Sequence, residues 1–335
     1  MNRVVRLMLG VVFTGIFLVS GSVFAGAPTT LKMAAILSVG GEEPWDGTFL
    51  SAWENARKNN PHGLEINEPE FTAGLWGDEA EAAARVYAKK GYDIVWLHSS
   101  YSDQVKKIQN KFPETLFVVS GSGNEGLGKN QYWIYHRDHE AAYLQGIVAG
   151  MTTKSNVLGI VGTFPADDVW DLINGFFLGA QSVNPNTKKK ITFIESWWDP
   201  PKARESSNAQ IAAGADNILM VATAFEACRE HGIKCHGAYT NWIPTAPDVI
   251  NSSFMISWIP HVDWVIAEWY QAKTNGTPFA GNTEKRWFLM KDGAIDVAIS
   301  DSLPAEVKAK VAEAKSKILS GELVIPIITN PVESD

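Results

Sequence analysis

The feature that most constrains the fold of this chain is a regular alternation of short apolar strands with helices. The hydrophobic pattern predicts strands in the first half at residues 31–39, 65–67, 92–97 and 115–120. It predicts further strands ending at residue 162 and at residues 191–195, 217–221 and 234–239. Helical patterns separate most of these strands, and such alternation is typical of βαβ units with parallel strands. The sequence therefore predicts an α/β protein with one parallel sheet before about residue 150 and a second sheet after it.

The connection between the two predicted sheets contains no Gly/Ser-rich or Pro-rich tether. We therefore expect two doubly wound lobes joined by a hinge of several close strands. The predicted N-terminal lobe holds residues 31–150 and roughly 255–290, and the predicted C-terminal lobe holds residues 151–254 and roughly 291–335. Ligands of open α/β sheets bind beyond the carboxyl ends of the strands, so the cleft between the lobes is the expected site.

The stretch from Gly159 to Pro185 shows this arrangement most clearly. An apolar strand ends at Gly162, a loop carries Asp167 and Asp168, and an apolar helix follows. The loop is expected at the carboxyl end of a strand, where ligands bind. Adjacent carboxylates usually point apart, so we interpret Asp168 as an acceptor of hydrogen bonds from a polar ligand rather than as half of an acid/base pair.

The first 25 residues have the pattern of a secretory signal peptide. Arg3 and Arg6 precede an apolar run at residues 7–20, and Val23-Phe24-Ala25 is a small-x-small cleavage pattern. The apolar run is shorter than the ~20 residues of a transmembrane helix. No Cys near the cleavage pattern offers a lipid anchor. We expect cleavage near Ala25 and a periplasmic protein.

The charge of the chain argues against nucleic acid as a partner. The 335 residues carry a formal net charge of −8, and removal of Arg3 and Arg6 with the signal makes the mature chain more acidic. Binding to nucleic acid requires at least a basic patch, and no local cluster of Lys and Arg in the sequence is large enough to offset the acidic charge. A small-molecule ligand fits this composition better.

Motifs that could indicate a cofactor, a metal or catalysis do not have the required context. Residues 121–126 match G-x-G-x-x-G, but a turn and a strand follow instead of the helix that would receive a pyrophosphate. His136 and His139 are three residues apart, whereas the zinc-hydrolase helix needs a spacing of four with a Glu between. The sequence has no G-x-S-x-G elbow and no P-loop. We therefore expect no catalytic residue, no metal site and no cofactor.

The chain has only two cysteines, Cys228 and Cys235. An oxidising compartment permits a local disulfide between them. Two free buried thiols remain an equal alternative, because pairing depends on a Cα separation that the sequence does not give.

Tryptophan is the unusual residue of this chain, with thirteen copies. Packing in the core or between the lobes explains any single one of them. Several tryptophans nevertheless fall at predicted strand ends beside acidic or amide residues, as a clamp for a flat polar ligand would require. These are Trp45, Trp76, Trp197, Trp198, Trp242 and Trp258.

Two blocks resemble the signatures of the basic membrane protein family of ABC-transporter substrate-binding proteins. The first block runs from Gly159 through Pro165 to Asn174-Gly175-Phe176, Gly179-Ala180 and Asn184-Pro185. The second is Ser196-Trp197-Trp198-Asp199-Pro200 with Lys202, followed by Gly214-Ala215-Asp216. The resemblance extends from about residue 33 to residue 326 and is strongest to the branch that binds purine nucleosides and bases. It implies a type I periplasmic-binding-protein fold.

The resemblance also implies site residues. Glu42, Trp45 and Asp46 match a motif in which an aromatic residue stacks on the base, although Asp46 stands where the family has Asn. Thr223 is what remains of a polar loop of the family, and Trp258 occupies the place of a lysine near the ribose. The full set of candidate ligand-binding residues is Glu42, Trp45, Asp46, Ser99, Asp168, Trp197, Trp198, Thr223, Asn241, Trp242 and Trp258.

These residues give a specific hypothesis for the site. Trp45 and Trp198 would cover the two faces of a flat ring, with Trp197 as a close alternative to Trp198. Carboxylates would accept hydrogen bonds from the ring edge, and Asn241 and Trp242 would close the site from the second lobe. For Asp199, capping of the following helix is at least as good an interpretation as ligand contact.

The expected function is that of an extracytoplasmic solute-binding protein of an ABC importer, with a purine nucleoside or nucleobase as ligand. Its partners would be this ligand and the permease, and the protein would be a monomer. One alternative is a sensory binding protein for a different small polar ligand. A secreted α/β enzyme is a third class, which the lack of a nucleophile or metal motif disfavours.

Overall fold

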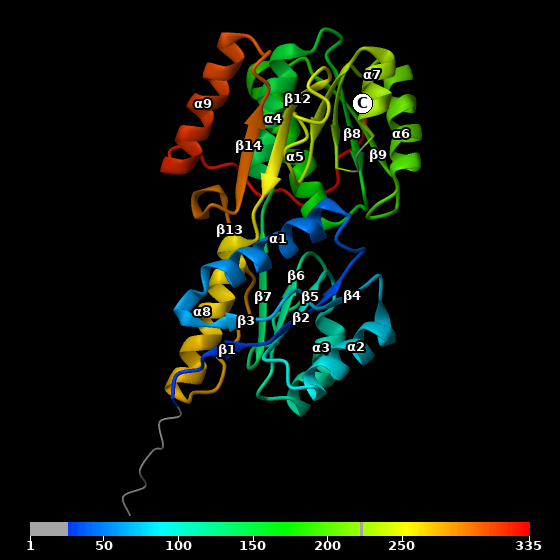
Figure 1. Ribbon diagram of the computed structural model, residues 1–335. Coiled ribbons are helices and arrows are strands. Elements are labelled where there is room, and N and C mark those ends of the chain that lie inside the picture. The colour runs from blue at the N-terminus through cyan, green and yellow to red at the C-terminus, as the bar shows by residue number, and fades with distance from the viewer. Residues whose placement is uncertain (1–25, 222–223) are drawn as a thin grey trace, which may run out of the picture.

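The computed structural model describes residues 26–221 and 224–335, so the expected signal peptide at residues 1–25 and the candidate Thr223 lie outside the described residues. The described chain forms two lobes, one above the other in Figure 1, and each lobe contains a six-stranded sheet. No helix in these two ranges combines the length and the apolar character needed to cross a membrane.

The N-terminal lobe contains a sheet in which all neighbouring strands are parallel, with the order β13-β7-β6-β5-β2-β4. Its strands are β2 (Met33–Leu37), β4 (Phe71–Ala73), β5 (Ile94–His98), β6 (Leu116–Ser120), β7 (Gln131–His136) and β13 (Arg286–Phe288). A small parallel pair, β1 (Thr30–Leu31) with β3 (Glu65–Ile66), lies beside it. Its helices are α1 (Pro44–Asn59), α2 (Gly77–Lys89), α3 (Ser102–Ile108) and α8 (Ile259–Asn275).

The C-terminal lobe has the strand order β14-β12-β11-β10-β8-β9, in which only β14 is antiparallel to its neighbour. Its strands are β8 (Val157–Gly162), β9 (Lys188–Phe193), β10 (Asn217–Met220), β11 (Lys234–Gly237), β12 (Ile250–Ile256) and β14 (Ile295–Ile299). Its helices are α4 (His139–Thr152), α5 (Asp167–Val183), α6 (Pro200–Ala212), α7 (Phe225–His231) and α9 (Ala305–Ser320). Short 3₁₀ turns η1 (Pro61–Gly63), η2 (Gln109–Lys111) and η3 (Met290–Asp292) complete the described elements.

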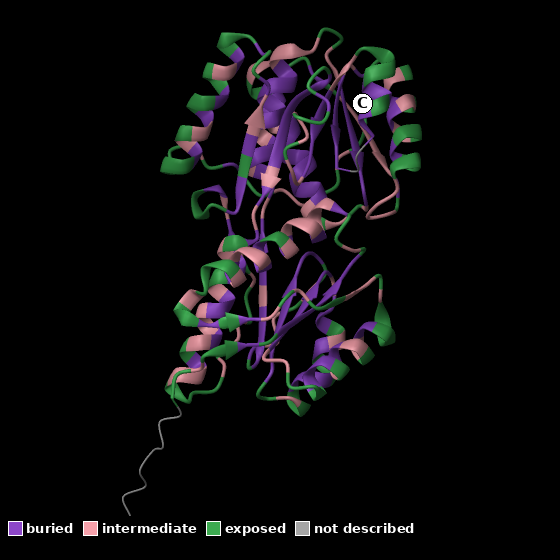
Figure 2. Ribbon diagram, in the orientation of Figure 1, coloured by how far each residue is buried: buried purple, intermediate pink, exposed green. Residues whose placement is uncertain are grey.

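Helices cover both faces of each sheet, and this explains the continuous apolar strands of the sequence. Every residue of β2, β5 and β6 is buried, as expected for parallel strands packed on both sides. Figure 2 shows buried strands at the centre of each lobe, with helices whose outer faces are exposed. The helices therefore cover the faces of each sheet and leave the carboxyl ends of its strands uncovered.

The chain crosses between the lobes three times, after β7, after β12 and between β13 and β14. The first crossing, at Arg137 and Asp138, comes earlier than the predicted boundary at residue 150. Helix α4 therefore belongs to the C-terminal lobe, where Gly146 and Gly179 let it approach α5 so closely that a Cβ on either would lie 1.9 Å from a carbonyl oxygen of the other helix. The helical pattern correctly indicates a buried helix there but does not indicate which sheet it covers.

The two cysteines form a disulfide in the structure. Cys228 lies in α7 and Cys235 in β11, and their Cα atoms are 6.2 Å apart. The bond therefore closes the short turn between a helix and the strand that follows it, within the C-terminal lobe. Of the two alternatives that the sequence left open, the structure has the paired one.

Candidate functional site

A cavity lies between the lobes. Both lobes contribute to its wall, mostly from the carboxyl ends of parallel strands. The lining residues are Ser38, Glu43, Trp45, Ser99, Gly121, Ser122 and Tyr135 from the N-terminal lobe, and Thr163, Asp168, Trp197 and Tyr239 from the C-terminal lobe.

Glu43 begins α1 and forms one polar part of the cavity wall. Pro44 occupies the first helical position, so the preceding residue becomes the N-cap. The Glu43 carboxylate accepts backbone N–H groups from Trp45 at 3.0 Å and from Asp46 at 2.9 Å. Burial raises the pKa of the Glu43 carboxyl from 4.5 to about 7, against the lowering effect of those two hydrogen bonds. Near neutral pH this group can therefore either accept or donate a hydrogen bond.

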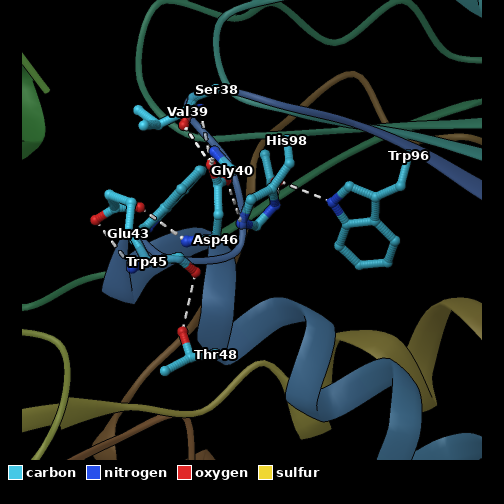
Figure 3. Close-up of polar contacts among 10 residues, drawn as sticks. Ser38, Val39, Gly40, Glu43, Trp45, Asp46, Thr48, Trp96 and His98 are labelled. Carbon is cyan, nitrogen blue, oxygen red and sulfur yellow. Dashed lines mark hydrogen bonds and ion pairs between the residues drawn. The ribbon is translucent and has the colours of Figure 1, made fainter. Parts of the chain in front are cut away.

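Asp46 organises the loop beside the cavity but does not line the cavity. Its side chain is fully buried, and one carboxylate oxygen accepts hydrogen bonds from the Ser38 hydroxyl at 3.1 Å and from the backbone N–H groups of Val39 and Gly40 at 2.8 and 2.9 Å. Figure 3 shows this carboxylate turned toward the loop after β2. Asp46, which stands where the family motif has Asn, therefore holds the loop that carries Ser38.

Trp45 presents one face of its indole to the cavity. Its other face lies on the His98 ring, with centroids 3.8 Å apart and an interplanar angle of 27°. Trp258, which is fully buried, meets Trp45 edge to face at 5.3 Å. Since protein rings already occupy one face and part of the edge, the cavity-facing side is the surface left for a ligand. Trp258 supports Trp45 from behind and does not line the cavity.

Asp168 and Tyr135 meet across the two lobes. The Tyr135 hydroxyl, from β7, donates a hydrogen bond of 2.9 Å to the carboxylate of Asp168, the second residue of α5. Burial raises the pKa of the Asp168 carboxyl, and the neighbouring Asp167 adds to this effect. Thr163 also lines the cavity, and its buried hydroxyl has no hydrogen-bond partner among the described residues. A buried group without a partner costs free energy, so this hydroxyl is a natural contact for a ligand.

Tyr239 completes the wall from the end of β11. Its φ of +67° is a left-handed conformation that is rare for a residue with a Cβ, and such strain is concentrated at functional sites. Burial raises the pKa of Tyr239 well above its usual range, so its hydroxyl is protonated at neutral pH.

The two neighbouring tryptophans of the second signature lie in different places. Trp197 lines the cavity and packs on Phe164 with centroids 4.7 Å apart. Trp198 instead lines a larger, more open recess together with Trp76, and this recess shares Ser38 and Trp197 with the inner cavity. The structure therefore brings Trp197, rather than Trp198, to the cavity that contains Trp45.

Three further candidates do not line the inner cavity. Glu42 is exposed beside the N-cap, and Asn241 is exposed in a turn where it accepts the N–H of Ile243. Trp242 packs on Phe225 inside the C-terminal lobe and donates its indole N–H to the Ala238 carbonyl. Asp199 caps α6 through the N–H of Lys202 at 3.1 Å, as its capping interpretation predicted. Ser99 does line the cavity.

Sequence reasoning missed a set of lining residues which, apart from the helix cap Glu43, share one property, a position just after or at the end of a strand. The strand-end rule that selected Asp168 would have found several of them if applied to every strand. Pro44 could have identified Glu43, rather than Glu42, as the helix cap. The missed residues are Ser38, Glu43, Gly121, Ser122, Tyr135, Thr163 and Tyr239.

The lining residues define the chemistry of the site. They include two carboxyl groups and six hydroxyl groups, and no Lys or Arg of the described chain lines the cavity to offer a counter-charge to an anionic ligand. Within residues 26–221 and 224–335, no group of three or more His, Cys, Asp or Glu side chains could hold a metal ion. The arrangement suits an uncharged flat ring whose edge carries hydrogen-bond donors.

A comparison with protein families identifies the family of the chain. Residues 35–329 match the family model of PnrA-like ABC transporter substrate-binding proteins, named Bmp. The chain belongs to the Bmp family. It is therefore a substrate-binding protein of an ABC transporter and not an enzyme, and substrate-binding proteins of this kind act outside the cytoplasm.

Curated relatives cover most of the Bmp-family chain. A purine-binding protein of Brucella abortus is 30% identical over 251 residues, which are 74% of this chain and 69% of the relative. A nucleoside-binding protein of Lactococcus lactis is 26% identical over 89% of this chain and 90% of its own. A protein of Haloferax volcanii whose name gives glucose as its ligand is 28% identical over 81% of this chain and 68% of its own.

Solved structures show the same fold. A solute-binding protein of an ABC transporter from Aeropyrum pernix superimposes with a TM-score of 0.72 at 16% identity, covering 90% of this chain and 94% of its own. This likeness confirms the expected periplasmic-binding-protein fold with parallel sheets in two lobes.

Proposed function

We propose that this Bmp-family protein binds a purine base or nucleoside in the interlobe cavity and delivers it to the permease of an ABC importer. The observation that carries the proposal is the free indole face of Trp45 beside the carboxyl groups of Glu43 and Asp168. A purine has two flat faces for aromatic packing and edge nitrogens that donate and accept hydrogen bonds. No Lys or Arg of the described chain lines the wall, and this favours an uncharged ligand over one that needs a cationic partner.

Trp45 and Trp197 are the aromatic residues proposed to cover the two faces of the ring. They come from opposite lobes, so both contacts exist only when the lobes are closed. A ligand that contacts both lobes shifts the population toward the closed state. The unpartnered hydroxyl of Thr163 and the carboxyl groups of Glu43 and Asp168 would then bond the edge of the ring.

The named ligands of the relatives support a purine but also define an alternative. Two relatives bind purines or nucleosides by name, whereas a third binds glucose by name. A sugar would also find carboxyl and hydroxyl groups here, and aromatic faces can pack on sugar rings. We prefer the purine because an indole face already backed by another ring is suited to stacking with a second flat ring.

A thermal-shift screen with adenine, guanine, hypoxanthine, their nucleosides, ribose, glucose and amino acids tests the proposal. A ligand that binds only the folded state should raise the free energy of unfolding by about 2.7 kcal/mol when its concentration is a hundredfold above Kd. We expect bases or nucleosides to raise the melting temperature and the other compounds to leave it unchanged. A shift with sugars or amino acids alone would contradict the purine assignment.

The transport role, the periplasmic location and the monomeric state are parts of the same proposal. A sensory protein that presents its ligand to a membrane receptor would have the same cavity. Uptake of labelled purine, compared between cells that have this protein and cells that lack it, distinguishes the two roles. Uptake depends on the protein only if the protein acts in transport. Unchanged uptake in a strain with no other purine importer would favour the sensory role.

The buried carboxyl of Glu43 gives a prediction for pH dependence. Since burial raises its folded-state pKa from 4.5 to about 7, its contribution to stability is fully present below pH 4.5 and is lost as the pH rises through 7. The free energy of unfolding of the wild type, relative to Glu43→Gln, should therefore fall by about 2 to 3 kcal/mol between these limits. Denaturant unfolding of both ligand-free proteins across this range measures the difference. A difference that does not vary with pH would show that Glu43 titrates normally.

A further inference from the structure

Behind the cavity wall, three rings of the N-terminal lobe form a continuous stack. Trp45 and Phe49 lie four residues apart on α1, so their side chains leave the same face of the helix. The ring of His98, the last residue of β5, lies between them. Its centroid is 3.8 Å from that of Trp45 and 4.4 Å from that of Phe49, with interplanar angles of 27° and 24°. The cavity-facing side of Trp45 is therefore the exposed end of a buried stack.

Hydrogen bonds fix the orientation of the His98 ring within this stack. The Ser120 hydroxyl accepts the indole N–H of Trp96 at 2.9 Å and lies 3.0 Å from Nδ1 of His98. When Ser120 donates its one hydroxyl hydrogen to Nδ1, the proton of the neutral imidazole resides on Nε2. The Nε2 atom faces Oδ1 of Asp46 at 3.9 Å (Figure 3). Neither of these two atoms has a hydrogen-bond partner among the described residues.

The surroundings keep His98 neutral. Its side chain is fully buried, and this burial lowers the pKa of the imidazole well below its usual range, with a further contribution from His136. Trp258 meets the His98 ring edge to face at 4.4 Å and closes the open side of the stack. The imidazole is therefore held as an uncharged flat ring whose position is set by β5 and by Trp258.

We propose that His98 is a positioning residue of the ligand site, which holds the indole of Trp45 in the orientation that stacks on the ligand. The proposal rests on the proposed function, because it assigns the free face of Trp45 to the ligand. Trp45, Phe49 and His98 all belong to the N-terminal lobe, so the stack persists when the lobes separate. The ligand then binds first to this preformed face, and closure of the C-terminal lobe follows.

Two substitutions of His98 test the role of its flat ring and the role of its polar atoms separately. His98→Gln removes the flat ring but keeps a group that can accept from Ser120, whereas His98→Phe keeps a flat ring and loses the polar atoms. Without a backing ring Trp45 must be ordered by the ligand, so we expect His98→Gln to weaken binding of adenine and adenosine about tenfold in calorimetry. His98→Phe should stay within about threefold of the wild type.

A matched control distinguishes positioning from a general loss of stability. His236 is also fully buried, with Nδ1 2.7 Å from the Ser252 hydroxyl, but it lies in the sheet of the C-terminal lobe and does not line the cavity. We expect His236→Gln to lower the melting temperature without changing affinity. Ligand-free crystal structures of the two His98 variants add a readout that needs no ligand, since Trp45 should turn in His98→Gln and stay in place in His98→Phe.

The outcomes separate this inference from the proposed function. If the wild type binds neither adenine nor adenosine nor any other purine, the proposed function fails, and the ligand-free structures still decide whether His98 positions Trp45. An unmoved Trp45 in His98→Gln, with affinity equal to that of the wild type, would overturn the inference alone. An equal loss of affinity in His98→Phe and His98→Gln would also overturn it, because the ring would not be the part that matters.

Discussion

Replacing Trp45 by alanine should lower the affinity for the preferred purine at least about a hundredfold while the protein remains folded. Among the described aromatic side chains that line the cavity, Trp45 has the closest stacked ring behind it, that of His98 at 3.8 Å. An indole at the centre of a binding site is the type of residue that carries most of the binding free energy. Alanine would remove both the stacking face and the apolar wall of the cavity. Isothermal titration calorimetry on the ligand that shifts the melting temperature most measures the effect.

Two comparisons make the Trp45 result interpretable. Trp264 is half-buried on α8, where it packs on Tyr132 and lines none of the cavities described above. Trp264→Ala should therefore reduce stability but keep the affinity. Trp45→Phe keeps a smaller aromatic face and should bind more weakly than the wild type but more tightly than Trp45→Ala. Unchanged affinity in Trp45→Ala would refute stacking on this residue, whatever the effect on stability.

The sequence was sufficient to predict the architecture because periodicity reports directly on burial. Alternating apolar strands and helices indicated parallel sheets in two lobes, and the lack of a tether indicated a close hinge. The boundary of the first lobe was wrong because periodicity does not identify the partner of a buried face. Helix α4 is apolar nearly all round, and only its glycines at positions 146 and 150 indicate a close contact with another helix.

The candidate site was predicted less completely, because contacts between distant segments leave little trace in a sequence. The pairing of Tyr135 with Asp168 joins two residues 33 positions apart, and the ring of His98 reaches Trp45 from another strand. A sequence match to a motif also does not show the direction of a side chain. Asp46 matches the family motif, yet its carboxylate points to the backbone of its own loop.

Replacing Gly179 by alanine should destabilise the protein by about 3 kcal/mol, although intrinsic helix propensity predicts the opposite sign. Gly179 lies inside α5, where alanine would ordinarily stabilise a helix by about 1 kcal/mol relative to glycine. A Cβ at this position would, however, lie 1.9 Å from the carbonyl oxygen of Tyr143 on α4. Neither backbone can move away alone, because Gly146 and Gly175 make similar contacts along the same pair of helices.

The control for this prediction is a glycine whose Cβ would meet nothing. Gly321, the C-cap of α9, has a φ of +77° and open space around it, so Gly321→Ala should cost only the backbone strain, about 1 kcal/mol. Denaturant unfolding measures the loss of stability in both variants, and Gly179→Ala should lose more than Gly321→Ala. Because α5 carries Asp168 near its N-terminus, separation of α4 from α5 should also displace this carboxylate and weaken ligand binding. A stabilised Gly179→Ala protein would show that the two helices are not packed as closely as the structure has them.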